Sequence, residues 1–176
     1  MAIHIIIDGY NMIRQSPGLS DLERIDIQHG REALIDWLAV YKRIRPHKIT
    51  VVFDGSSAPA LSTGRDFIKG IAIRFSRRGE TADTVIKRMA RQEKEHALVV
   101  SSDREVVEVA ASHGAATISS PEFEEKLVMA EHSNTKGFAL DGEQNGPGWK
   151  PSTKKRGPRR RLSKQRRRNK LKISKL

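Results

Sequence analysis

Four aspartates stand where they could act on one shared substrate. Asp8 and Asp54 each end a short β-branched run, and Asp103 directly follows another. Asp83 lies in the first turn of a predicted helix. In a parallel sheet all strands end at one edge, and open α/β sheets bind ligands in the crevice at that edge. The sequence therefore predicts that these carboxylates converge there, with the Asn11 amide pointing into the same crevice.

Converging carboxylates raise one another's pKa, so the cluster needs a positive charge among them. Oxygen ligands without thiolate partners suit hard ions, namely Mg²⁺ or Mn²⁺. The chain has no Cys, which excludes disulfides, zinc–thiolate sites and cysteine nucleophiles. Its six histidines show no paired ligand spacing.

Each acid also has a local structural alternative. Asp54 could belong only to an Asp-Gly turn, Asp83 could only favour the helix dipole, and Asp103 could only begin a helix beside Ser102. Such explanations would have to hold for all four acids at once, so the metal site is the favoured interpretation. Glu80 is a weaker fifth candidate. For Ser101 and Ser102, capping competes with binding of a phosphate or a metal-bound water.

Strands and helices alternate over the part of the chain that carries these acids. Hydrophobic periodicity predicts strands at residues 4–7, 48–53, 71–75, 97–101 and 116–118. It predicts helices at residues 27–44 and 81–95, one capped by Ser102 and ending at 113–114, and one capped by Ser120. Residues 55–70 are expected to be a loop, either a lid or a substrate wall. The predicted fold is α/β, with a mainly parallel sheet covered by helices on both faces.

The net charge of +12 is concentrated at the C-terminal end. Residues 147–176 hold 14 of the 33 Lys and Arg residues and no acid, which leaves 19 basic against 21 acidic residues elsewhere. We therefore expect one domain at residues 1–131, then a linker and a disordered basic tail at 132–176. A polycation suits nucleic acid, because neutralising phosphates releases counterions. A solubilising tail or attraction to an anionic membrane surface is the alternative. The tail residues predicted to bind RNA are Lys154, Lys155, Arg156, Arg159, Arg160, Arg161, Arg166, Arg167 and Arg168.

No apolar run approaches the roughly 18 residues needed to cross a bilayer. The first residues, MAIHIIIDGY, lack the basic region and the hydrophobic stretch of a signal peptide. We therefore expect a cytoplasmic protein that does not interact with a membrane.

Across residues 3–131 the motifs IIIDGYN, VVFDG, FSRRGETADTVI and VVSSDREV occur in this order. In this order they resemble the NYN domains, relatives of the PIN-domain ribonucleases, and among them the YacP-like bacterial group. The resemblance implies a three-layer α/β/α PIN-like fold, a Mg²⁺ or Mn²⁺ site and endoribonuclease activity on RNA. By position, Asp8, Asp54, Asp83 and Asp103 would be its acidic cluster, with Asn11 as a polar companion. Relatives are linked with RNA processing or decay and in some cases with the translating ribosome, so we expect mRNA or rRNA at the ribosome as the substrate.

Together these observations predict metal-assisted hydrolysis of a phosphodiester, which needs no nucleophilic side chain. Asp8, Asp83 and Asp103 would hold metal directly or through water. Asp54 would ligate or orient water, and Asn11 would position a ligand or phosphate. Near the acids, the residues predicted to grip the RNA backbone are Arg74, Arg77, Arg78 and Lys69, with Arg65 and Lys87 beside them; a solvated surface is their alternative.

A second function remains open, a non-catalytic RNA- or ribosome-binding adaptor that uses the basic tail. Only the catalytic hypothesis makes RNA loss depend on metal and on Asp8. Other chemistries fit worse. A haloacid-type phosphatase needs a second Asp where this chain has Tyr10, and a response-regulator receiver needs a Lys-Pro pair where it has Ser120-Pro121.

Overall fold

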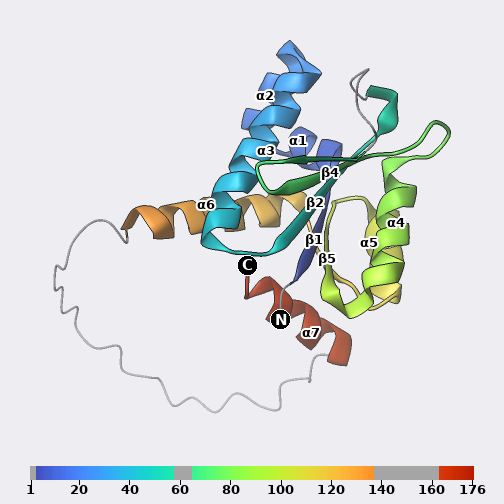
Figure 1. The fold of residues 1–176 in the computed structure, drawn as a ribbon. Helices are drawn as coiled ribbons and strands as arrows, with labels where there is room; N and C mark the ends of the chain where they lie inside the picture. Colours follow the sequence, from blue (N-terminus) through green and yellow to red (C-terminus); the bar gives the residue numbers. More distant parts are fainter. Residues whose placement is uncertain (1–2, 58–64, 137–162) are drawn as a thin grey trace.

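The computed structural model describes residues 3–57, 65–136 and 163–176, and its strands form one sheet in the order β3-β4-β2-β1-β5-β6 (Figure 1). The strands are β1 His4–Asp8, β2 Lys48–Phe53, β3 Arg65–Ile68, β4 Ile71–Phe75, β5 Ala97–Val100 and β6 Ala116–Ile118. Neighbouring strands are parallel except for β3, which pairs antiparallel with β4. The mainly parallel sheet predicted from the sequence is confirmed.

Helices cover both faces of this sheet. They are α1 Gly9–Gln15, α2 Pro17–Ile25, α3 Ile27–Ile44, α4 Ala82–Glu93, α5 Arg104–Ser112, α6 Ser120–Lys136 and α7 Lys164–Ile173, with 3₁₀ turns η1 Gly55–Ser57 and η2 Lys94–His96. Side chains from α1, α3 and α6 share one core with the sheet, and side chains from α4 and α5 share the other. The α/β/α layering is therefore confirmed.

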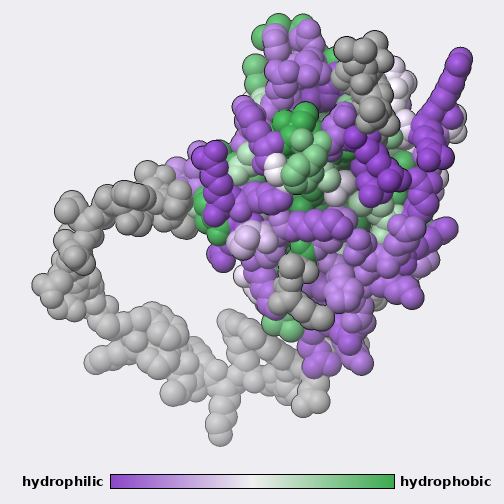
Figure 2. Space-filling view, in the orientation of Figure 1, coloured by the Kyte–Doolittle hydropathy of each residue, from purple (hydrophilic) through white to green (hydrophobic). Residues whose placement is uncertain are grey.

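The middle of the central strand β1 is a run of three isoleucines, and the layers of the fold explain this run. Ile5 and Ile7 belong to the core on the α3 side, whereas Ile6 belongs to the core on the α4 side. Successive side chains of a strand point to opposite faces, so a strand covered on both faces must be apolar at every position. All three side chains are fully buried. Most of the molecular face in Figure 2 is hydrophilic, as expected when the apolar groups lie between the layers.

Two predicted helix caps were wrong by one residue. Helix α5 is capped by Asp103, whose Oδ1 accepts a hydrogen bond from the Val106 N–H at 3.0 Å, and not by Ser102. Helix α6 is preceded by Ser119, which forms a reciprocal capping box with Glu122; the Glu122 carboxylate accepts from the Ser119 N–H at 3.2 Å. Ser102 and Ser120 are thereby left to make other contacts near Asn11.

Part of the predicted loop at residues 55–70 is ordered. Residues 55–57 form η1, and β3 pairs with β4 through a turn in which Lys69 and Gly70 both have positive φ. Helices α1 and α2 were also not predicted. Residues 58–64 lie outside the described residues, so the expectation that they form a lid or wall stays a prediction.

The expectation of disorder over residues 132–176 was wrong for two segments. Helix α6 continues to Lys136, and residues 164–173 form α7. The Asn169 side chain bonds both backbone groups of Thr117 in β6, at 2.8 and 3.1 Å. Tyr41 donates its hydroxyl hydrogen to the Leu176 carbonyl, and Leu176 is buried. The basic helix therefore forms on the domain, which supplies the apolar partners that the segment lacks. Among the described helices, none is long and apolar enough to cross a membrane.

Candidate active site

All four predicted aspartates line one pocket at the carboxyl end of β1 and β2. Its volume is about 580 Å³. The lining residues are Asp8, Tyr10, Asn11, Arg14, Gln15, Asp54, Ser56, Thr81, Ala82, Asp83 and Asp103. We call this space the acid pocket. Its acids come from β1, from the residue after β2, from the first turn of α4 and from the cap of α5, as expected for the edge where parallel strands end.

Asp8 is the most enclosed of these acids. Only 8% of it is exposed, and its two oxygens accept hydrogen bonds from the Asn11 N–H (3.2 Å) and the Ser101 hydroxyl (3.3 Å). The pKa of Asp8 is raised to about 6, chiefly by burial; the nearby charges of Asp83 and Asp103 also raise it, and the two hydrogen bonds lower it. Ionised Asp8 is therefore costly without a positive charge beside it.

The other acids differ in how well their charge is compensated. Burial raises the pKa of Asp83, and the charge of Asp103 adds to this rise. By contrast, hydrogen bonds from Ser56 lower the pKa of Asp54. The pocket thus combines one readily ionised carboxylate with two whose ionised forms are disfavoured, an imbalance that a bound cation corrects.

The pKa of Asp8 predicts how stability depends on pH in the absence of metal. Between pH 4 and 6 the folded protein retains the Asp8 proton while the unfolded chain loses it, so the free energy of unfolding falls as pH rises. The full loss, present above pH 6, is on the order of 3 kcal/mol. Denaturant titrations in EDTA should show this fall in wild type relative to Asp8→Asn. Parallel pH profiles for the two proteins would contradict it.

Asn11 and Ser101 hold the acid-bearing segments together. The Asn11 Oδ1 accepts hydrogen bonds from the Ser102 N–H (2.9 Å) and from the Ser120 hydroxyl (2.7 Å). The Ser101 hydroxyl donates its hydrogen to Asp8 Oδ2, and its oxygen accepts a hydrogen bond from the Asp103 N–H at 3.1 Å. Because its oxygen is already engaged by the protein, Asn11 joins α1 to the starts of α5 and α6 and thereby positions Asp8 and Asp103.

The glycines after Asp8 and Asp54 allow close packing at the pocket floor. A Cβ on Gly9 would lie 2.3 Å from the Phe53 ring, and one on Gly55 would lie 1.9 Å from the Ser76 carbonyl oxygen. The Gly55 N–H also donates to the Ser76 hydroxyl at 2.9 Å. Glycine is therefore needed at both positions because two segments pack closely there, and not because a turn requires a positive φ.

Some lining residues were not predicted, because α1 was not recognised. The Tyr10 ring packs 5.1 Å from that of Phe53, and its hydroxyl accepts a hydrogen bond from buried Arg31 at 3.3 Å. The Arg14 guanidinium lies 5.5 Å from the centre of the Tyr10 ring. The spacing of Tyr10 and Arg14 by one helical turn was the available signal, but it has meaning only once α1 is known.

Comparison with known proteins places this architecture in a family. The model of the YacP-like NYN domain matches residues 5–173. The chain belongs to this family. The match includes α7 as well as the motif-bearing part, and it confirms the resemblance given by the sequence motifs. NYN domains are nuclease-like and related to PIN nucleases, which generally depend on divalent metal ions and act on RNA.

Proteins similar to this NYN domain come from Bacillus subtilis. The uncharacterized protein YacP of strain 168 is 31% identical over 86 residues, which are 49% of this chain and 50% of YacP. The chain thus aligns with about half the length of that relative. The crystal structure of Rae1 (YacP) has a TM-score of 0.65 and 27% identity, covering 78% of this chain and 79% of that one. The crystal structure of a mutant of Rae1 has a TM-score of 0.63 and 25% identity, covering 76% of this chain and 80% of that one.

The four carboxylates around the acid pocket suit a hard cation, but they are not close enough together to enclose one. In the described residues, no three acidic or imidazole side chains are grouped tightly enough to hold a metal ion by themselves. Mg²⁺ usually keeps several waters and takes one or two carboxylates together with substrate phosphates. The carboxylates around the acid pocket fit this manner of binding, in which water and RNA complete the coordination.

The predicted RNA-gripping residues are divided between the two ends of the sheet. Arg74 and Arg77 line a second pocket near the acid pocket, and Arg78 is exposed in the loop between β4 and α4. Lys69 was wrongly placed beside the acids, because it lies in the β3–β4 turn, where β4 begins, and pairs with Asp36.

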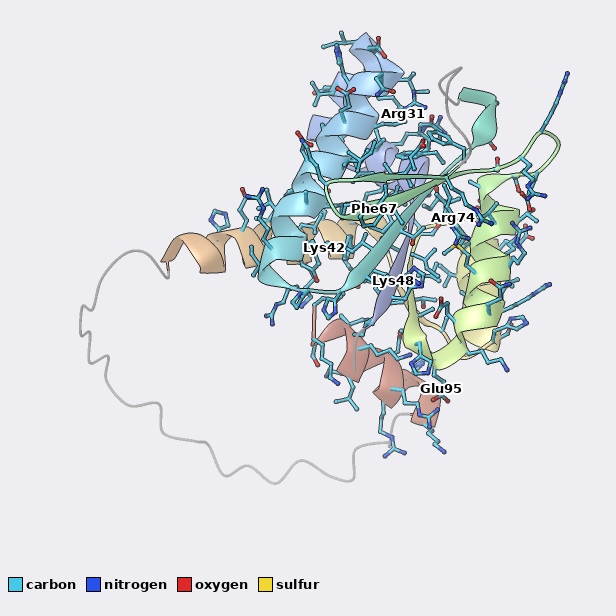
Figure 3. All side chains as sticks on the ribbon, in the orientation of Figure 1. Arg31, Lys42, Lys48, Phe67, Arg74 and Glu95 are labelled. Atoms are coloured by element: carbon cyan, nitrogen blue, oxygen red, sulfur yellow. The ribbon has the colours of Figure 1, made fainter. Side chains whose placement is uncertain are left out.

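The basic residues of α7 also lie away from the acid pocket. Helix α7 sits by the start of the parallel strands (Figure 1), and His47, just before β2, contacts the Lys175 carbonyl at 3.3 Å. Arg168 pairs with Glu95, which Figure 3 labels at this end, whereas Arg166 and Arg167 are exposed. The remaining predicted tail residues, Lys154, Lys155, Arg156, Arg159, Arg160 and Arg161, lie outside the described residues.

Proposed function

We propose that this NYN domain is a Mg²⁺- or Mn²⁺-dependent endoribonuclease that hydrolyses RNA phosphodiester bonds in the acid pocket. The observation that carries the proposal is the convergence of four aspartates from four separate segments on one pocket, with Asp8 buried among them. Membership in a nuclease-like family supports RNA as the substrate.

The residues have distinct roles in this proposal. Asp8, Asp83 and Asp103 hold the ion directly or through water, and the readily ionised Asp54 orients the attacking water. Asn11 positions the segments that carry Asp8 and Asp103. A divalent ion bound here lowers the pKa of water and stabilises charge on the phosphate and on the leaving oxygen.

The proposal extends to mRNA or rRNA at the ribosome in the cytoplasm. It is supported by Arg166 and Arg167 on α7, which are exposed and lie at the end of the sheet away from the acid pocket. Cations there can hold a second RNA segment while another lies over the acids. The same separation favours the alternative function, an RNA- or ribosome-binding adaptor that needs no acid pocket.

Metal dependence separates these two functions. We expect discrete products from a pool of single-stranded and structured RNA with Mg²⁺ or Mn²⁺, and none in EDTA, because the carboxylates need the ion to activate water. Matched DNA serves as the control for substrate class. If folded protein binds RNA but cuts it with neither ion, alone or with ribosomes present, the adaptor function replaces the endoribonuclease.

A further inference from the structure

Four arginines surround a small pocket next to the acid pocket. It has a volume of about 130 Å³ and is lined by Arg65, Arg74, Phe75, Arg77, Glu80, Val85 and Arg88. We call it the arginine pocket. Its arginines come from β3, from β4, from the loop after β4 and from α4, so the fold itself brings them together. Figure 3 labels Arg74 between the sheet and α4.

The strand register places two of these cations face to face. Arg65 of β3 is the direct partner of Arg74 in the antiparallel pair. Like charges directly opposite each other in adjacent strands are destabilising. Arg88 approaches from α4 and pairs with Glu80, the single acid among the described residues that line the pocket. The described lining of the pocket therefore contains four guanidinium groups and one carboxylate, an excess of positive charge.

The electrostatic environment of Arg74 reflects this imbalance. Arg74 is half-buried, and burial lowers its pKa from the ordinary value. The charges of Arg65 and Arg88 lower it further, and among the influences on Arg74 only the charge of Glu93 acts in the opposite direction. An anion in the pocket would offset this repulsion.

A single short segment separates the two pockets. Arg77 and Glu80 line the arginine pocket, whereas Thr81 and Asp83 line the acid pocket. The segment is tied to the end of β2, because the Ser76 N–H donates to the Phe53 carbonyl at 3.0 Å. The two pockets are therefore lined by neighbouring residues of one segment, the loop before α4 and the start of that helix.

We propose that the arginine pocket binds one phosphate of the RNA backbone, a few nucleotides from the phosphate cleaved in the acid pocket. The inference rests on the proposed function and assigns Arg65, Arg74 and Arg88 as positioning residues. Guanidinium groups donate paired hydrogen bonds that match phosphate oxygens. Holding this phosphate fixes which bond of the strand lies over the carboxylates.

The test measures binding of a single-stranded RNA to the full chain in EDTA, where binding is read without cleavage. Arg74→Gln should weaken binding about tenfold and reduce the slope of log affinity against log salt by about one. Arg65→Gln, an exposed position, should do the same if Arg74→Gln fails to fold. Arg91→Gln, an exposed arginine of α4 outside the pocket, carries the same charge change and should alter affinity less than about twofold.

A scan with single neutral methylphosphonate linkages locates the phosphate. One linkage, a few nucleotides from the mapped cleavage site, should weaken binding to wild type and to Arg91→Gln but have no effect on Arg74→Gln. Equal losses in all three proteins at every linkage, or equal affinities of Arg74→Gln and Arg91→Gln, would overturn the phosphate site. Absence of cleavage by wild type with either metal ion would instead overturn the proposed function, so the two failures are distinguishable.

Discussion

Asp8→Asn is expected to lower RNA cleavage by about a hundredfold or more while making the metal-free protein more stable at pH 7. The amide keeps the shape of the side chain but removes the charge that holds a divalent ion, and metal activation of water is worth several kcal/mol. The same change removes the cost of an ionised, buried carboxylate, so the free energy of unfolding should rise by an amount on the order of 3 kcal/mol. Cleavage rates with Mg²⁺ and denaturant titrations in EDTA measure the two effects.

Asp21→Asn is the matched control for Asp8→Asn. Asp21 lies on α2 and is largely exposed, and it pairs with Arg24 on the same helix. Exposed pairs of this kind contribute little, so both rate and stability should stay near those of wild type. Wild-type cleavage by Asp8→Asn would exclude Asp8 from the chemistry, even if the stability rose as expected.

Gly55→Ala is expected to damage both the fold and the site. The new methyl group would lie 1.9 Å from the Ser76 carbonyl oxygen, and a backbone atom cannot turn aside as a side chain can. The end of β2 must therefore separate from the loop that leads to α4, which moves Asp54 away from Asp83. We expect a loss of about 1–3 kcal/mol in unfolding free energy and a fall of about a hundredfold in cleavage. Thermal unfolding and cleavage rates test this.

Two other glycine-to-alanine substitutions serve as comparisons for Gly55→Ala. Gly18 in α2 has no neighbouring atom within 4 Å of an added Cβ, so Gly18→Ala should be neutral or raise stability by up to about 1 kcal/mol. Gly9→Ala meets the ring of Phe53, which is fully buried and packs against Tyr10 and Phe75, so this change should also lower stability. If Gly55→Ala behaved like Gly18→Ala, the fixed contact between β2 and the α4 loop would be refuted.

Sequence periodicity found the elements that are buried on both sides. The strands β1, β2 and β5 are buried at every position except Lys48 and are mostly apolar, because helices cover both faces of the sheet. Their order along the chain was enough to predict that Asp8, Asp54 and Asp103 would meet at one edge. That part of the site follows from the order and direction of the strands, so the sequence alone predicts it.

Elements held by partners distant in sequence were not predictable in the same way. The edge strand β3 has only four residues, mostly exposed, and so carries no apolar alternation. In α7, basic residues mask the helical pattern, and Thr117, which bonds Asn169 of this helix, lies far away in sequence. The same holds for Tyr41, which bonds Leu176 just after α7. Helix α2 did carry a signal, since Ser16-Pro17 resembles the Ser-Pro pair that marked α6.

The detailed contacts of the acid pocket also lay beyond the sequence. The caps by Asp103 and Ser119 each differ by one residue from the predicted ones, and neighbouring serines are indistinguishable by propensity. Only the structure shows that Ser102 and Ser120 bond Asn11. Similarly, the register that sets Arg65 against Arg74 depends on a hairpin that was expected to be loop.

The position of β1 in the middle of the sheet affects how the protein folds. Its neighbours are β2, where His4 pairs with Lys48, and β5, where His4 pairs with Ala97. Contacts between residues so far apart in the chain slow folding, because loop closure must precede the pairing that rewards it. During synthesis, the second edge of β1 therefore stays unpaired until β5 has been made, and Asp103 joins the chain only after β5. We expect chains that end before Ala97 to lack an assembled acid pocket, so catalytic competence would arise late and in a single cooperative step.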